Sequence, residues 1–163
     1  MHMRVFAFSS LSALAVAVLG CGSNSIPSAP TASVPISGTQ ATPFPFNAGE
    51  GVLIGTEGFV SIVITNIGSQ DMIVSGVTYT GDGAITLNPG VSVSTNSMAT
   101  EPWDVPYNSA LVVGLTCTPV VTHPEVQETY NGLVDIKSNA SNLPDIQIYL
   151  QCVGVPPSTD GGA

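Results

Sequence analysis

The sequence predicts an all-β protein, an antiparallel β-sandwich of about seven strands. From Gly51 onwards, short runs alternate apolar with polar residues, and this period of two is typical of half-buried strands. Turn-forming residues separate the runs, and no convincing apolar period indicates a helix. Charged residues make up only 8% of the chain, while glycine and proline are abundant. This composition is typical of an extracytoplasmic all-β domain.

Residues 1–20 are interpreted as a signal peptide. Arg4 supplies a positive charge, and the uncharged stretch Val5–Leu19 is short for a transmembrane helix but suits a signal-peptide core. The stretch leads into Ala17-Val18-Leu19-Gly20-Cys21, which resembles the lipobox of bacterial lipoproteins. In that family the peptidase cleaves before the cysteine, so the resemblance implies that Cys21 carries the lipid. The alternative is an ordinary signal peptide followed by an incidental cysteine.

Lipidation of Cys21 would hold the protein stably in a membrane, because each buried CH₂ group contributes about 0.8 kcal/mol to membrane binding. Residue 22 is glycine. In the Gram-negative sorting scheme that this motif resembles, aspartate at that position retains a lipoprotein in the inner membrane. We therefore expect a cell-envelope protein, an outer-membrane lipoprotein of a Gram-negative bacterium.

Residues 21–47 are predicted to be the lipidated cysteine and a flexible linker. Prolines recur there among serine, threonine, alanine and glycine without an apolar period, and this composition favours an extended, solvated chain. Phe44 and Phe46 at its end are candidates for docking on the domain as a first edge strand. The domain is expected over residues 48–155, and residues 156–163 are expected to be a disordered tail.

The first half of the domain contains three predicted strands. Residues 60–65 alternate with the even positions inward, and the run ends at the turn 66–68. In the run 71–79 the parity of the apolar residues switches after Val74, which predicts a β-bulge at Ser75-Gly76. The turn 80–83 leads into a short strand, Ala84–Leu87, which is expected to end at the turn Asn88-Pro89-Gly90.

The second half begins with residues 91–108, the least regular part of the chain. The run 111–117 then alternates with its odd positions inward, and a loop over residues 120–128 follows. Val134 and Ile136 are the inward residues of the next strand. Six or seven strands in about 100 residues imply two sheets packed face to face. The last strand has the clearest inward set, which consists of Ile146, Ile148, Leu150 and Cys152.

Five segments of the domain occur in a characteristic order: 63–68 (VITNIG), 115–119 (LTCTP), 130–132 (YNG), 136–139 (IKSN) and 150–154 (LQCVG). Together they resemble the bacterial choice-of-anchor, abnormal-spindle/hydin-like immunoglobulin-type domain, which is related to the major sperm protein fold. The resemblance covers roughly residues 48–155. It implies an immunoglobulin-like sandwich that serves as a non-catalytic scaffold or interaction module and needs no cofactor.

The chain departs from that family at two positions, where phenylalanine and glycine are frequent but Cys117 and Cys152 stand here. The replaced positions lie near the same end of the sandwich. With Cys21 lipidated, these two cysteines are an even pair in an oxidising compartment. We therefore predict a disulfide, whose loop of 36 residues would contribute roughly 3–4 kcal/mol on the chain-entropy model. The alternative is two buried free thiols.

Charge and composition exclude several classes of function. The net charge is −9, and Arg4 and Lys137 are the only strong bases, so nucleic-acid binding is excluded. His123 is the only histidine beyond the signal peptide and lies in a predicted loop, which argues against a metal centre and a Ser/His/Asp hydrolase. Glu125 and Glu128 share that loop and are interpreted as solvated acids. We expect no enzyme, no cofactor and no metal.

Trp103, Tyr107 and Tyr149 are the candidate binding surface, because aromatic side chains are favoured at interfaces and sugar sites. The alternative for Trp103 is a place at one end of the core. The sequence thus predicts a non-catalytic, membrane-anchored interaction or structural module at the surface or in the periplasm, with a carbohydrate-binding module as the alternative. The expected partners are the membrane, through the lipid on Cys21, and an unidentified protein or glycan.

Overall fold

The computed structural model describes residues 25–94, 100–120 and 126–157, and the structural statements below refer to these residues. Cys21, the predicted signal peptide and residues 158–163 of the predicted tail lie outside them. The described chain forms one short 3-10 helix, η1 (Phe46–Gly49), and ten strands. The strands are β1 (Ala32–Ser33), β2 (Phe44–Pro45), β3 (Val52–Leu53), β4 (Gly58–Asn66), β5 (Met72–Gly81), β6 (Ile85–Val93), β7 (Trp103–Val105), β8 (Ala110–Cys117), β9 (Glu128–Ser138) and β10 (Asp145–Val155).

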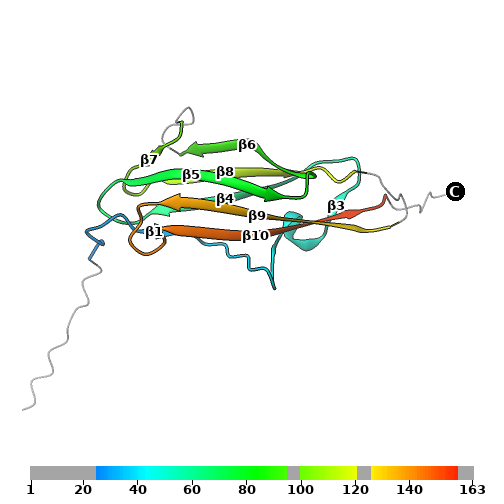
Figure 1. The fold of residues 1–163 in the computed structure, drawn as a ribbon, viewed down its shortest axis with the longest axis horizontal. Coiled ribbons are helices and arrows are strands. Elements are labelled where there is room, and N and C mark those ends of the chain that lie inside the picture. Colours follow the sequence, from blue (N-terminus) through cyan, green and yellow to red (C-terminus); the bar gives the residue numbers. More distant parts are fainter. Residues whose placement is uncertain (1–24, 95–99, 121–125, 158–163) are drawn as a thin grey trace, which may run out of the picture.

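The strands form two sheets that pack against each other (Figure 1). Sheet A has the strand order β1-β4-β8-β6, and sheet B has the order β2-β10-β9-β5-β7, with β3 also paired to β10. All pairs among β4–β10 are antiparallel, whereas the two-residue strands β2 and β3 run parallel to β10. The prediction of an all-β, immunoglobulin-like sandwich is confirmed, and β4–β10 are its seven main strands.

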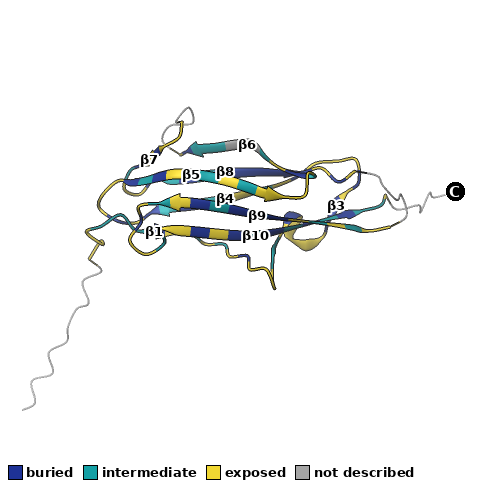
Figure 2. Ribbon diagram, viewed as in Figure 1, coloured by how far each residue is buried: buried dark blue, intermediate teal, exposed yellow. Residues whose placement is uncertain are grey.

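The core lies between the sheets and follows the predicted alternation. Ile62 and Ile64 of β4 are buried from sheet A, and Ile148 and Leu150 of β10 are buried from sheet B. Figure 2 shows buried and exposed positions alternating along β10. Because a slip of one residue would turn every one of these side chains toward solvent, the apolar pattern fixes the register of the strands.

β5 changes its inward parity at a β-bulge, as the sequence predicts. Its register with β9 shifts between Val74 and Gly76. Met72 and Val74 are buried before the shift, and Val77 and Tyr79 pack against the core after it. The extra residue therefore keeps the apolar side chains of both halves of β5 on the same face of sheet B.

The prediction that a strand ends before Asn88 is wrong. β6 continues through the expected turn and pairs with β8 from Ile85 to Val93. Between Thr86 and Gly90 its register shifts, because four steps along β6 face two steps along β8. Turn-forming residues are therefore accommodated as an irregularity inside a strand instead of between two strands.

The prediction of a flexible linker is wrong from Pro27 onwards, because residues 27–47 are hydrogen-bonded to the sandwich. β1 pairs with β4 in sheet A, where Ala32 faces Asn66, and β2 pairs with β10 in sheet B, where Phe44 faces Leu150. Ala32 and Phe46 are buried in the core, and Phe44 packs against it. The docking predicted for Phe44 and Phe46 is confirmed. The segment finds its partners on strands far away in the sequence, so its own composition carries no sign of them.

Cys117 at the end of β8 and Cys152 in β10 form a disulfide, as predicted. Both residues are fully buried, and the bond joins sheet A to sheet B. We call this end of the sandwich, which includes the start of β4, β3 and the β5–β6 turn, the disulfide end. We call the opposite end, where β4 stops, the Asn66 end. It includes residues 26–31, 66–70, 106–109 and 139–143.

Candidate functional site

The outer face of sheet B carries side chains of β5, β9 and β10 that stand in register. Tyr149 of β10 faces Leu133 of β9, and Leu133 faces Thr80 of β5. Directly opposite residues in antiparallel strands have Cβ atoms about 4.5–5.5 Å apart. These three side chains therefore form one row across the sheet.

A groove of about 440 Å³ lies along this row. Its lining side chains include two amides, a hydroxyl and a phenol, and none of them carries a formal charge at neutral pH. The groove therefore combines hydrogen-bonding groups with an aromatic ring in a neutral setting. The lining residues are Gln40, Pro43, Thr80, Asn131, Gly132, Leu133, Tyr149 and Leu150.

A tight turn over residues 39–42 belongs to the segment that borders the groove. Thr39 and Thr42 exchange two backbone hydrogen bonds of 3.1 and 3.2 Å, and their hydroxyl oxygens lie 2.8 Å apart. The N–H of Tyr149 donates to the carbonyl oxygen of Gly38 at 3.0 Å, which fastens the turn to β10. A Cβ atom at position 38 would collide with the backbone of Tyr149 and Phe44, so this close approach requires glycine.

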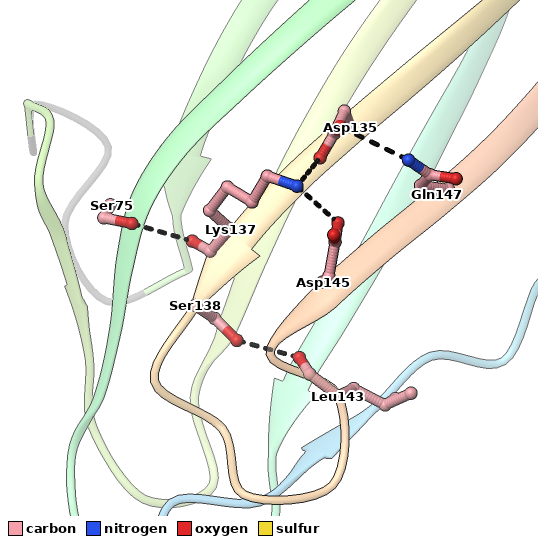
Figure 3. A network of polar contacts seen from close by, with 7 residues as sticks. All are labelled: Ser75, Asp135, Lys137, Ser138, Leu143, Asp145 and Gln147. Atoms are coloured by element: carbon pink, nitrogen blue, oxygen red, sulfur yellow. Dashed lines mark hydrogen bonds and ion pairs between the residues drawn. The ribbon is translucent and has the colours of Figure 1, made fainter.

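A charged network occupies the same face toward the Asn66 end (Figure 3). Lys137 Nζ lies 3.0 Å from Asp135 Oδ1 and 2.7 Å from Asp145 Oδ1. The hydrogen bond from Lys137 lowers the pKa of Asp135, and the hydrogen bond to Asp145 raises the pKa of Lys137. Lys137 is the only lysine or arginine among the described residues, so the cation of this face is held by two carboxylates beside the groove.

A second hollow, of about 480 Å³, lies at the disulfide end. The hydroxyl of Tyr130 donates to Glu128 Oε2 at 2.7 Å, and this hydrogen bond raises the pKa of Tyr130. Asp82 Oδ2 accepts the N–H of Asn131 at 2.6 Å. The ionisable groups of this hollow thus bind groups of the protein itself, which makes it a weaker ligand site than the groove. Its lining residues are Asp82, Gly83, Ala84, Thr118, Val120 and Tyr130.

The three aromatic residues predicted to form one binding surface do not lie together. Trp103 is 8% exposed and belongs to the core, because the short strand β7 pairs with β5 and turns the indole inward. Its assignment to the binding surface is wrong, and the core alternative holds. Tyr107 is 47% exposed but lies in the β7–β8 loop at the Asn66 end. Only Tyr149 lines the groove.

Five lining side chains of the groove were not predicted from the sequence. The alternation of β9 places Asn131 and Leu133 outward, so it contained a signal for these two. Thr80 was assigned to a turn, although β5 extends to Gly81. Gln40 and Pro43 belong to the segment interpreted as a linker, and nothing in its sequence indicates that it borders sheet B.

In residues 25–94, 100–120 and 126–157, no three histidine, cysteine, aspartate or glutamate side chains come together as a possible metal site. His123 and Glu125 lie outside these residues. None of the helical structure in the described chain is long and apolar enough to cross a membrane.

No protein-family model matches the chain, and neither does any curated protein. Among solved structures, a protein of unknown function from Porphyromonas gingivalis W83 is similar, with a TM-score of 0.52 and 15% sequence identity. The match covers 82% of this chain and 50% of that chain, so the present chain spans about half the length of its structural relative. At this identity the similarity shows a shared fold.

Two further structures are similar at lower TM-scores. The ASH/PapD-like domain 7 of human CEP192 matches with a TM-score of 0.47 and 11% identity, over 93% of this chain and 100% of that chain. A family 123 glycoside hydrolase from Clostridium perfringens matches with a TM-score of 0.44 and 7% identity, over 65% of this chain and 22% of that chain.

Proposed function

We propose that this chain is a non-catalytic interaction module of the cell envelope that is anchored to a membrane through Cys21. We propose further that its partner binds at the outer face of sheet B. The observation that carries the proposal is the neutral groove on that face, with Tyr149 and Leu133 in its lining and a hydrogen-bonded turn beside it. Aromatic anchors in grooves bordered by polar groups are typical of binding sites.

The lining of the groove supports binding without catalysis. General acid–base catalysis needs a group that titrates near the working pH, and nucleophilic catalysis needs a nucleophile beside a base. The groove offers Gln40, Thr80, Asn131 and Tyr149 as its polar side chains. No histidine, carboxylate, cysteine or lysine is among the described residues that line the groove, so no base lies beside the hydroxyl of Thr80.

The membrane anchor in this proposal rests on the sequence Ala17-Val18-Leu19-Gly20-Cys21 and its resemblance to a lipobox. Placement in the outer membrane rests on Gly22. Membership of the choice-of-anchor, abnormal-spindle/hydin-like family rests on the order of the five segments between residues 63 and 154. That family supplies scaffolds and interaction modules, which agrees with a binding groove that lacks catalytic groups.

A carbohydrate-binding module is the second candidate, and the neutral lining of the groove favours it. Sugars present many hydroxyl groups, which pair with amides such as those of Gln40 and Asn131. Sugar rings also pack on aromatic faces, and Tyr149 supplies one. An uncharged glycan would fit these groups without leaving a buried charge unpaired.

The test uses the mature chain with Cys21→Ser, which removes the sulfur that would carry the lipid, for pull-down from envelope extracts and for a glycan array. Tyr149→Ala should weaken capture of the partner by about 2 kcal/mol or more, roughly thirtyfold, because it removes the aromatic anchor. Tyr107→Ala is the matched control, because Tyr107 is exposed at another end, and it should leave capture unchanged. Equal capture by both variants would contradict the proposed groove, and an array without hits would exclude the second candidate.

A further inference from the structure

The N-terminal segment joins the sandwich at the Asn66 end and is fastened there from Pro27 onwards. Ser69 donates its N–H to the carbonyl oxygen of Pro27 at 2.8 Å, and Ile67 donates its N–H to the carbonyl oxygen of Thr31 at 2.8 Å. These bonds tie the segment to the loop between β4 and β5. The chain before Pro27 is therefore the only part that can act as a tether.

Five residues lie between Cys21 and Pro27, so the tether spans six residue steps. A fully extended chain spans about 3.3–3.6 Å per residue, so this tether reaches at most about 22 Å. A lipid on Cys21, which is part of the proposed function, would therefore keep the Asn66 end close to the lipid headgroups.

The Asn66 end also exposes three large side chains of the kind that membrane interfaces favour. Ile26 is 50% exposed, Ile67 is 42% exposed and Tyr107 is 47% exposed. Backbone hydrogen bonds bring their segments together: Ile67 is bonded to the N-terminal segment, and Asn108 donates its N–H to the carbonyl oxygen of Asn66 at 2.9 Å. Tyrosine is enriched at membrane–water interfaces, and isoleucine gains from leaving water.

The charge of the module indicates which membrane contact is available. Attraction to anionic headgroups needs clusters of lysine and arginine, and the only such residue in the described chain is Lys137. Lys137 is already paired with Asp135 and Asp145. Asp71 and Asp104, in segments that lead to the Asn66 end, are exposed acids. A contact at this end therefore depends on its apolar and aromatic side chains.

We propose that the Asn66 end rests on the lipid surface, with Ile26, Ile67 and Tyr107 in the interfacial layer. The disulfide end then points away from the membrane, and the groove on the side of sheet B stays open to a partner. The lipid on Cys21 supplies the attachment, and the three side chains set the orientation of the sandwich.

The test uses the lipidated full chain in phosphatidylcholine vesicles, prepared with either ordinary lipids or lipids brominated near the headgroup, which quench tryptophan. Ile67→Trp and Tyr107→Trp are the reporter variants, and the signal of the buried Trp103 in the unsubstituted chain is subtracted. Phe59→Trp is the matched control, because Phe59 is 61% exposed and lies at the disulfide end. Phe59 is seven residues from Asn66 along β4, or about 23 Å, and Ile67 follows directly after Asn66.

The orientation predicts a loss of fluorescence in brominated vesicles for tryptophan at positions 67 and 107 but not at position 59. Equal quenching at all three positions, or none at 67 and 107, would overturn it. Flotation of the same vesicles tests the anchor separately. A chain that floats without position-dependent quenching disproves the orientation alone, whereas a chain that does not float disproves the anchor and the orientation together.

Discussion

The two ends of the sandwich are held together by different chemistry. At the disulfide end, a covalent bond between Cys117 and Cys152 joins the two sheets. At the Asn66 end, the amide of Asn66 donates to the carbonyl oxygens of Gln70 and Val105 at 2.8 and 2.9 Å and accepts the N–H of Gly68 at 3.0 Å. A buried amide whose two N–H groups and oxygen are all hydrogen-bonded can thus hold loops together without a cross-link, but only while every partner is present.

Asn142 acts in the same way on the N-terminal segment. Its Oδ1 atom accepts the N–H of Ala32 at 2.9 Å, and its Nδ2 atom donates to the carbonyl oxygen of Ala32 at 2.8 Å. The two partners are 110 residues apart in the sequence. The difference between the two ends can be examined by removing these bonds one at a time.

Removal of the disulfide has the largest expected effect. Replacing Cys117 and Cys152 together by alanine should lower the free energy of unfolding by about 3–4 kcal/mol, because the unfolded chain regains the entropy of an open 36-residue loop. Urea unfolding with and without reductant measures this loss. Reductant should shift the midpoint of the natural chain and leave that of the double variant in place; an unchanged midpoint of the natural chain would count against the disulfide.

Removal of the Asn66 amide comes next. Asn66→Ala should lower the free energy of unfolding by about 2–3 kcal/mol, because three backbone groups lose a buried partner. Asn131→Ala is the matched control, since that side chain is exposed and its one hydrogen bond, to Gln151, is 3.4 Å long. Urea unfolding of the two variants compares their stabilities. If both variants lose a similar free energy of unfolding, burial of the amide is unimportant for its contribution to stability.

A tyrosine at the disulfide end predicts a loss of stability at alkaline pH. Burial and the carboxylate of Asp82 raise the pKa of Tyr79 from 10.0 to about 12. Between these values the unfolded chain releases the phenolic proton while the folded chain keeps it. The contribution of Tyr79 to stability is therefore complete below pH 10 and is lost as the pH rises toward 12.

Tyr79→Phe is the variant that isolates this effect. Its free energy of unfolding should fall less between pH 9 and pH 11 than that of the natural chain, because phenylalanine has no proton to lose. Lys137 titrates in both chains and cancels in the comparison. Parallel pH profiles of the two chains would mean that Tyr79 does not ionise differently on folding.

The ion pairs of Lys137 at the Asn66 side of sheet B have the smallest expected effect. Lys137→Gln should leave the urea midpoint within experimental error, because both ion pairs are exposed to solvent and screened by salt. The same measurement in low and high salt checks this. A large, salt-dependent fall in the urea midpoint of the variant would instead show that the network of Figure 3 stabilises the fold as much as Asn66 does.

The sequence predicted the features of the fold that depend on local alternation. The inward sets of β4, β8 and β10 follow directly from a period of two, and the change of parity after Val74 located the bulge of β5. The disulfide was predicted from the positions of Cys117 and Cys152 in the family pattern. The alternation and the bulge need no knowledge of which strands are neighbours, whereas the disulfide was predicted through the resemblance.

The features that the sequence did not predict depend on long-range contacts. Residues 29–46 look like a linker because their hydrogen bonds go to β4, β10 and the β9–β10 loop. Trp103 looked available for binding because the pairing of β7 with β5, which buries it, leaves no local pattern. The groove was missed for the same reason, since Gln40, Thr80 and Tyr149 meet only after sheet B has formed.

The proposed anchor at Cys21 would place this module at a membrane, and mass spectrometry of the N-terminus is the decisive test of it. The full chain is produced in a Gram-negative host, extracted from membranes with detergent and digested. We expect an N-terminal peptide that begins at Cys21 and carries the mass of a diacylglycerol group on its sulfur. A chain that begins at another residue, or a Cys21 without lipid, would contradict the proposed anchor.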